Sequence, residues 1–188
     1  MQNYRPSNHE KSYPVLKIRE LRQGYCDFNS DLCSSNNIDE EYIIKNNDVI
    51  FSWSGSLLVD IWSGGTCGLN QHLFKVTSNK YEDWFYYYWT KHHLNNFIRI
   101  AEGKATSLGH IKREELDKAV VLIPPIEHYN KINRIISPIF NSLKVQKIEK
   151  IQLMKLQSTL LPKLMLENSD SSTAKLSFSE NNTGSQNE

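Results

Sequence analysis

A long stretch without glycine, residues 127–161, constrains the fold of this chain more than any other feature. Its apolar residues Ile132, Ile136, Ile139 and Leu143 recur at spacings of three and four, which predicts one amphipathic helix. At about 1.5 Å per residue, some 35 residues would form a helix about 50 Å long, which is longer than a small domain is wide. We therefore predict a helix whose apolar stripe is covered by a partner helix. The alternative is an amphipathic helix that lies across its own domain.

Lysines interrupt this stripe around residues 144–150, and it resumes beyond them. Pro138 predicts a kink, because proline removes a backbone hydrogen bond from the helix interior. The side chains that we expect to contact a second helix are Ile132, Ile136, Ile139, Leu143, Met154 and Leu161.

Composition indicates one globular domain with appendages. The 188 residues are 39% hydrophobic and 23% charged, with a net charge of +1, so no strong overall field favours nucleic acid or membrane. The three cysteines lack C-x-x-C spacing, which argues against a disulfide framework or a structural zinc site. No apolar leader and no run near ~18 apolar residues is present, so we expect a cytoplasmic protein.

Short β-forming segments separated by turn residues fill the first half of the chain. Strands are expected at 13–18, 49–53, 57–62 and 73–76, with an extended segment at 42–44 and a loop at 24–40. A capping box formed by Asn79 and Glu82 predicts a helix that begins near residue 79 and ends before Gly103. A short helix at 112–117 and a buried strand at 120–123 follow.

The polar composition beyond Met165 predicts a disordered tail. The expected organisation is therefore an α+β fold: a β-rich recognition domain at 1–126, a long coiled-coil-type helix at 127–165, and the tail at 166–188.

Two sequence patterns are similar to those of enzymes. Asp83, Glu102 and Lys104 follow the order found in metal-dependent nucleases, which predicts a small Mg²⁺-dependent nuclease as the alternative function. The pair at 124–125 is similar to the N-P-P-aromatic signature of amino-methyltransferases, but Ile123 and Ile126 flank the prolines and cannot bond an amine. Without H-x-x-x-H spacing or a glycine-rich loop, we expect no metal and no cofactor.

Two polar segments are suited to binding DNA. Asn70, Gln71 and His72 present side chains that can hydrogen-bond base edges, and the loop at 104–113 mixes hydroxyls, cations and glycine. The alternative is that Asn70 and His72 satisfy buried backbone groups at the start of a strand. The candidate DNA-binding residues are Ser54, Ser56, Asn70, Gln71, His72, Lys104, Thr106, Ser107, His110, Lys112 and Arg113.

Five blocks in a fixed order carry a resemblance to a known family. They are D-V-I-F-S-W-S-G-S at 48–56, L-N-Q-H-L-F-K-V at 69–76, T-S-L-G-H-I-K-R at 106–113, V-L-I-P-P at 121–125 and L-L-P-K-L-M at 160–165. The chain resembles the DNA-specificity subunit of type I restriction–modification systems over about residues 13–165.

That resemblance implies a non-catalytic protein in which a recognition domain reads a DNA half-site and a long helix pairs antiparallel with a second one. The implied partners are double-stranded DNA, adenine-modifying methyltransferase subunits and motor-nuclease (restriction) subunits. Complete subunits of that family carry two recognition domains and two long helices, whereas this chain has one of each. The family's domain also begins with a further segment before the stretch that matches 13–18. The chain could therefore be a half-subunit that dimerises, a fragment of an interrupted gene, or an assembly module that has lost DNA contact.

Overall fold

The computed structural model describes residues 4–7, 10–103 and 109–180, with side chains described as far as Met165. It divides into two compact units, Met1–Ile148 and Glu149–Glu188. Within the described part of the chain, no helix is both long and apolar enough to cross a membrane.

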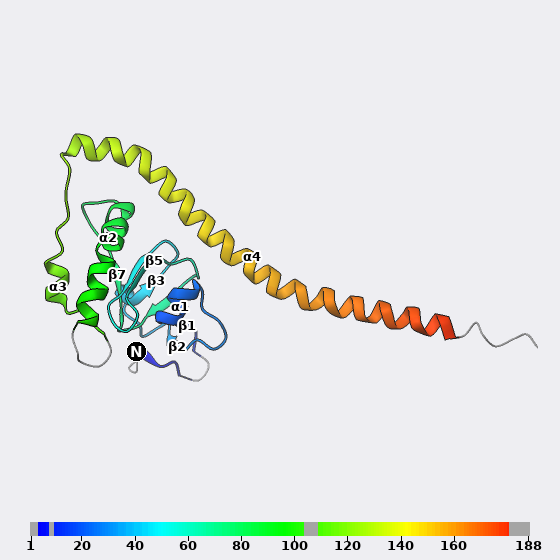
Figure 1. The fold of residues 1–188 in the computed structure, drawn as a ribbon. Helices are drawn as coiled ribbons and strands as arrows, with labels where there is room; N and C mark the ends of the chain where they lie inside the picture. Colours follow the sequence, from blue (N-terminus) through cyan, green and yellow to red (C-terminus); the bar gives the residue numbers. More distant parts are fainter. Residues whose placement is uncertain (1–3, 8–9, 104–108, 181–188) are drawn as a thin grey trace, which may run out of the picture. The chain divides into compact units, whose positions relative to one another are not determined.

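Two small sheets form the centre of the first unit (Figure 1). The first has the order β2-β1-β6-β3, in which β1 and β6 run parallel and the other pairs run antiparallel. The second is an antiparallel sheet of order β5-β4-β7. The strands are β1 (Ser12–Leu16), β2 (Leu32–Ser34), β3 (Ile43–Ile44), β4 (Val49–Ser52), β5 (Leu58–Ile61), β6 (Cys67–Leu69) and β7 (Leu73–Val76).

Helical segments surround and extend these sheets. They are α1 (Ile18–Gln23), the 3-10 turn η2 (Glu40–Tyr42), α2 (Asp83–Glu102), α3 (Arg113–Asp117) and α4 (Ile126–Glu180). The mixed α+β fold that the sequence predicts, with a β-rich part followed by a long helix, is confirmed.

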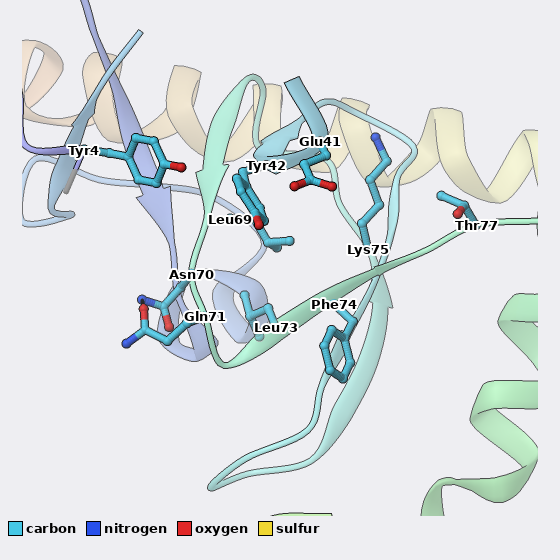
Figure 2. A pocket seen from close by; sticks show the side chains of 10 residues that line it. All are labelled: Tyr4, Glu41, Tyr42, Leu69, Asn70, Gln71, Leu73, Phe74, Lys75 and Thr77. Carbon is cyan, nitrogen blue, oxygen red and sulfur yellow. Dashed lines mark hydrogen bonds between the residues drawn. The ribbon is translucent and has the colours of Figure 1, made fainter. Parts of the chain in front are cut away.

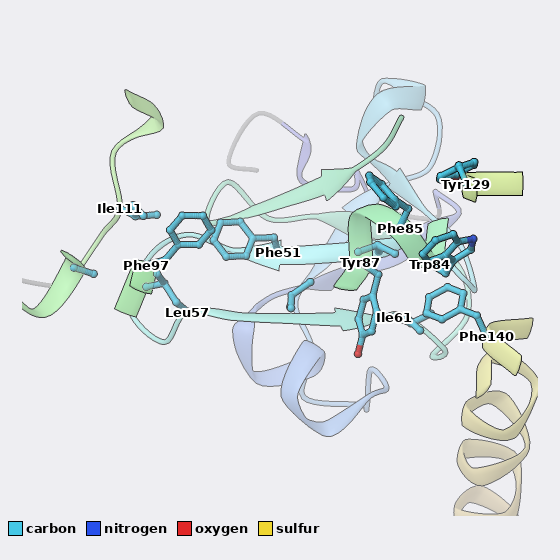
Figure 3. Packing of buried hydrophobic residues seen from close by; sticks show 13 residues of the cluster. Phe51, Leu57, Ile61, Trp84, Phe85, Tyr87, Phe97, Ile111, Tyr129 and Phe140 are labelled. Carbon is cyan, nitrogen blue, oxygen red and sulfur yellow. The ribbon is translucent and has the colours of Figure 1, made fainter. Parts of the chain in front are cut away.

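Strand β4 is buried on both faces because its side chains alternate between two hydrophobic clusters. Val49 and Phe51 belong to the larger cluster, which contains the aromatic face of α2, and Phe51 lies 6.0 Å from Phe97 between ring centroids (Figure 3). Ile50 points the other way, into a cluster with Leu16 of the first sheet. The two sheets are therefore held together through β4.

The first part of α4, up to residue 148, is docked on this unit. Phe140 is 1% exposed and Tyr129 is 7% exposed within the larger cluster. The backbone N–H of Glu82 donates to Tyr129 Oη at 3.0 Å, and Trp84 Nε1 donates to Asn133 Oδ1 at 2.6 Å. These hydrogen bonds hold the first turns of α4 against the N-terminus of α2.

Two ion pairs extend this contact. Lys144 pairs with Asp83 at the start of α2, and Lys147 pairs with Asp60 of β5. For residues 126–148, the interpretation of a helix lying across its own domain is thus correct.

Three sequence-based expectations need correction. Residues 120–123 are extended but are assigned to no strand, and Val120 and Leu122 are 69% and 72% exposed, so they are not a buried strand. The helix α2 begins at Asp83 rather than near Asn79, because Ser78 Oγ accepts the N–H groups of Lys80 and Tyr81 and holds them in a turn. The loop expected at 24–40 contains β2.

The long helix begins at Ile126, one residue before the predicted start at 127, and includes Pro138. Its assigned end is Glu180, and residues 181–188 lie outside the described part. The division into recognition domain, spacer helix and tail remains a prediction.

Candidate nucleic-acid interface

The strand order brings several chain segments to one edge of the first unit. The parallel strands β1 and β6 end at the same edge, and the antiparallel strand β2 begins there. In the second sheet, the end of β4 lies beside the start of β7, since Ser52 is paired with Leu73. Segments that follow or precede these strand ends can therefore meet.

Trp53, directly after β4, joins two of the polar segments that the sequence singles out. Its backbone N–H donates to the carbonyl of His72 at 3.2 Å, and its carbonyl accepts from the N–H of Ile111 at 3.0 Å. Its indole Nε1 donates to the carbonyl of Gln71 at 3.1 Å. Residues 70–72 and 109–113 are thus fixed beside each other, in what we call the Trp53 junction (residues 53, 70–74 and 109–113).

Aromatic and histidine rings cluster on this junction. The ring of Trp53 stacks on Phe74 at 5.8 Å with an interplanar angle of 19°. His72 and His110 lie 5.9 and 6.1 Å from the same indole. Phe74 is 43% exposed, so the stack reaches solvent. Sequence reasoning missed Trp53 and Phe74, although an aromatic residue next to each polar segment was a visible signal.

Phe74 lines three hollows, one of which, of about 670 Å³, extends along α2. The other two hold most of the Trp53 junction. The larger, of about 730 Å³, is lined by Tyr4, Glu41, Tyr42, Leu69, Asn70, Gln71, Leu73, Phe74, Lys75 and Thr77 (Figure 2). The smaller, of about 390 Å³, is lined by Trp53, Phe74 and residues 110–114. The ring is therefore a ridge between two concave, mixed polar and aromatic surfaces.

The walls of the larger hollow have defined electrostatics. A hydrogen bond to Glu41 raises the pKa of Tyr42 above its ordinary value. Tyr4 donates to Asp39 Oδ2 at 2.8 Å, and Lys75 pairs with Asp48 at 2.9 Å. The hollow consequently offers donors and acceptors rather than a uniform cationic surface.

The structure separates the predicted DNA-binding residues into three groups. Exposed on or beside the junction are Ser56, Gln71, His72, His110, Lys112 and Arg113. Asn70 and Ser54 are buried, 7% and 8% exposed. Lys104, Thr106 and Ser107 lie outside the described residues.

Asn70 supports the backbone of its neighbours. Its Oδ1 accepts the N–H of His72 at 3.2 Å, and its Nδ2 donates to Gln71 Oε1 at 3.1 Å. These contacts favour the alternative given for Asn70 from the sequence, namely that it satisfies local polar groups. Asn70 then shapes the turn that leaves Gln71 and His72 exposed.

Two residues of the nuclease alternative, Asp83 and Glu102, do not meet, and the third, Lys104, lies outside the described residues. Asp83 and Glu102 are the first and last residues of the 20-residue α2, about 28 Å apart along its axis. Asp83 is paired with Lys144. Among the residues described, no group of three or more His, Cys, Asp or Glu side chains is placed to hold a metal ion.

Comparison with known proteins identifies a family and several proteins to which the chain is similar. The family model of the type I restriction modification DNA specificity domain matches residues 4–153. The type I restriction enzyme MjaVIII specificity subunit of Methanocaldococcus jannaschii is 26% identical over 133 residues, which are 70% of this chain and 30% of that protein. A solved structure from work on complex assembly and conformational transition of the type I R-M system aligns with a TM-score of 0.40 and 16% identity, over 85% of this chain and 41% of that one. The chain therefore spans about a third of the length of the curated relative.

Proposed function

Because the chain belongs to the type I restriction modification DNA specificity domain family, we propose that its first unit reads a short half-site in double-stranded DNA. In this proposal the protein directs adenine methylation and DNA cleavage that partner subunits carry out. The Trp53 junction carries the proposal, because it gathers exposed amide, imidazole and cationic side chains on one surface.

The two kinds of side chain at the junction have different roles. Lys112 and Arg113 contact phosphates and position the protein, whereas Gln71 reads a base edge with its carboxamide. His72, His110 and Ser56 supply further polar contacts. Lys104, Thr106 and Ser107 are also proposed to contact DNA, on the basis of the sequence alone. Phosphate contacts supply most of the affinity, and base contacts supply the preference.

The chain itself is proposed to have no catalytic activity and no bound cofactor. Ile123 and Ile126 flank the two prolines where an amino-methyltransferase would hold its target amine. Methyltransferase and restriction subunits are therefore the proposed partners. The purified chain should transfer no methyl group from S-adenosylmethionine to DNA, and a matching methyltransferase subunit should restore methylation at one defined site.

A second specificity half is proposed to pair with this chain through α4. Ile136 and Leu143 pack against the chain's own core, so they are not available for that contact. Ile132, Ile139, Met154 and Leu161 are 41%, 61%, 39% and 53% exposed and remain candidates. Leu153 and Leu160 continue the seven-residue spacing of Ile132 and Ile139, which favours a helical partner.

DNA binding by the full chain, alone and with a methyltransferase subunit, tests this function. A selection from a randomised duplex library would define the preferred site. Lys112→Ala and Arg113→Ala should each weaken binding to every sequence and reduce the slope of log K against log salt by about one unit. Gln71→Ala should instead relax preference at one base.

Lys131→Ala is the matched control, because Lys131 is exposed on α4 and is not one of the residues of the Trp53 junction. It should leave both affinity and salt slope unchanged. If the chain selected no sequence in either state, or if all four variants behaved alike, the proposed function would be wrong.

A further inference from the structure

Phe28 is the most exposed large apolar side chain in the part of the chain that the structure describes. It is 95% exposed, in the loop between α1 and β2. Scattered apolar side chains on a surface are ordinary. Phe28 differs because the loop that carries it is held rigidly by several hydrogen bonds.

Local hydrogen bonds fix the backbone on both sides of Phe28. The N–H of Asp27 donates to Ser30 Oγ at 3.1 Å, and the N–H of Ser30 donates back to the carbonyl of Asp27 at 3.1 Å. The N–H of Asn29 donates to Asp27 Oδ1 at 2.9 Å. Phe28 therefore stands at the tip of a closed turn.

A buried carboxylate anchors this turn to α1. Glu20, only 1% exposed, accepts hydrogen bonds from Ser30 Oγ at 3.1 Å and from Arg19 Nη2 at 2.6 Å. The same guanidinium contacts both carboxylate oxygens of Asp27, at 3.0 and 3.2 Å. Arg19 lowers the pKa of Asp27, so this pair stays charged at neutral pH.

The turn lies at the same edge as the Trp53 junction. The N–H of Val15 donates to the carbonyl of Asp31 at 2.7 Å, and the N–H of Asn70 donates to the carbonyl of Leu16 at 3.1 Å. The loop that carries Phe28 leads into β2, and the segment with Asn70 follows β6. Because β2 and β6 both pair with β1, the two segments lie on either side of the end of β1. Two strand spacings are about 10 Å, which corresponds to about three base-pair rises of 3.4 Å.

The acidic side chains at the turn are partly compensated by cations. Arg19 pairs with both Glu20 and Asp27, and Lys17 pairs with Asp31, so three carboxylates face two cations. The turn consequently presents an apolar side chain among paired charges. In the major groove, the apolar group available to such a side chain is the 5-methyl group of thymine.

We propose that Phe28 is a specificity-determining residue that contacts a thymine methyl group in the major groove, about three or four base pairs from the base read by Gln71. This inference rests on the proposed DNA-binding function and adds a second contact to it. The rigid turn matters because a backbone already held in place loses little conformational freedom on binding.

Replacement of thymine by deoxyuridine tests the contact, because it removes only the methyl group. In the selected site, each thymine is replaced in turn, and binding of the full chain is measured by fluorescence anisotropy. For the unaltered chain, one replacement at the stated spacing from the Gln71-dependent base should weaken binding about four-fold, the value of one buried methyl-sized group. With Phe28→Ala, overall binding should fall about ten-fold and that replacement should have no further effect.

Phe28→Leu and Leu122→Ala complete the design. The leucine variant keeps an apolar contact and should retain part of the sensitivity to deoxyuridine. Leu122 is 72% exposed and lines a hollow with Trp84 of α2 and Ile132 of α4, none of them in the Trp53 junction, so its loss should change nothing in DNA binding. All variants should melt like the unaltered chain, because both side chains are exposed.

Several results would overturn the inference. One is a selected site that has no thymine at that spacing. A second is a deoxyuridine replacement that weakens binding equally for the unaltered chain and for Phe28→Ala. A third is that Phe28→Ala no longer assembles with its partner subunits but still binds DNA as the unaltered chain does. The last would make Phe28 a protein-docking residue. Absence of any sequence preference in the unaltered chain would instead refute the proposed function itself.

Discussion

Replacement of Trp53 separates the two ways in which this side chain holds the candidate DNA surface. Trp53→Phe keeps an aromatic ring beside Phe74 but removes the indole N–H that donates to the carbonyl of Gln71 at 3.1 Å. Trp53→Ala removes that donor and also the contacts with Phe74, His72 and His110. The backbone bonds of residue 53 remain in both variants.

The expected magnitudes follow from these contacts. One hydrogen bond at a partly exposed site contributes about 0.5–1.5 kcal/mol, so Trp53→Phe should lower the free energy of unfolding by about 1 kcal/mol. Each ring pair adds about 0.5–1.5 kcal/mol beyond burial, which predicts a loss of about 2–4 kcal/mol for Trp53→Ala. Because Gln71 is released in Trp53→Phe, DNA affinity should fall about five-fold and preference should weaken at the base that Gln71 reads.

Urea unfolding and anisotropy titrations on the selected site give both quantities for each variant. Trp89→Ala is the control, because Trp89 is also a partly buried tryptophan but packs beside Phe85, His92 and His93 on α2. It should lose stability without loss of base preference. If Trp53→Ala bound its site with unaltered affinity and preference, the junction would not be the DNA surface.

Three further predictions concern other parts of the molecule. The double variant Met154→Asp with Leu161→Asp should reduce self-association of the chain in sedimentation without unfolding the first unit. The double variant Ile136→Asp with Leu143→Asp should unfold that unit. Unchanged association of the first variant would contradict pairing through α4. Burial raises the pKa of Tyr87 from its ordinary value of 10.0 to about 12. The contribution of protonated Tyr87 to the free energy of unfolding should therefore be complete below pH 10 and be lost as the pH rises through 12. Chemical unfolding at each pH measures this, and a free energy of unfolding that stayed constant between pH 10 and 12 would contradict it. A hydrogen bond with Cys67 lowers the pKa of Cys26, while burial raises that of Cys33, so brief alkylation of the native protein followed by peptide mapping should find Cys26 modified first; earlier modification of Cys33 would refute this order.

The elements that the sequence predicts well are those with strong local signals. Strand β7 matches the predicted 73–76 range, and β4 and β5 lie within their predicted ranges. Strand β6 has only three residues, one of them Gly68, and is held by pairing with β1 more than fifty positions earlier. A local pattern carries no information about such a partner. The apolar run at 120–123 was wrongly predicted as a buried strand, because an apolar run forms a strand only where a neighbouring strand is available to pair with it.

In the candidate site, too, the sequence predicts the segments with local signals but not the contacts between distant residues. The polar segments at 70–72 and 109–113 were visible as composition, but their contact depends on Trp53, whose backbone and indole bond to both. Phe28 was hidden in a stretch predicted only as loop. Its significance depends on a buried glutamate, Glu20, which local sequence patterns do not identify as the anchor of a turn.

The long helix reconciles two interpretations that seemed to exclude each other. Ile136 and Leu143 face the domain and join its core, while Ile132 and Ile139 remain 41% and 61% exposed on the same docked segment. These four residues form one stripe: the side of the stripe with Ile136 and Leu143 packs on the domain, and the side with Ile132 and Ile139 is left for a partner. Since Tyr129 and Phe140 anchor the docked segment at 7% and 1% exposure, the orientation of the exposed face relative to the Trp53 junction is set by packing rather than by a linker. A partner helix on that face would hold this junction at a fixed angle to its own recognition surface, which is the geometric requirement for reading two DNA half-sites at a defined spacing.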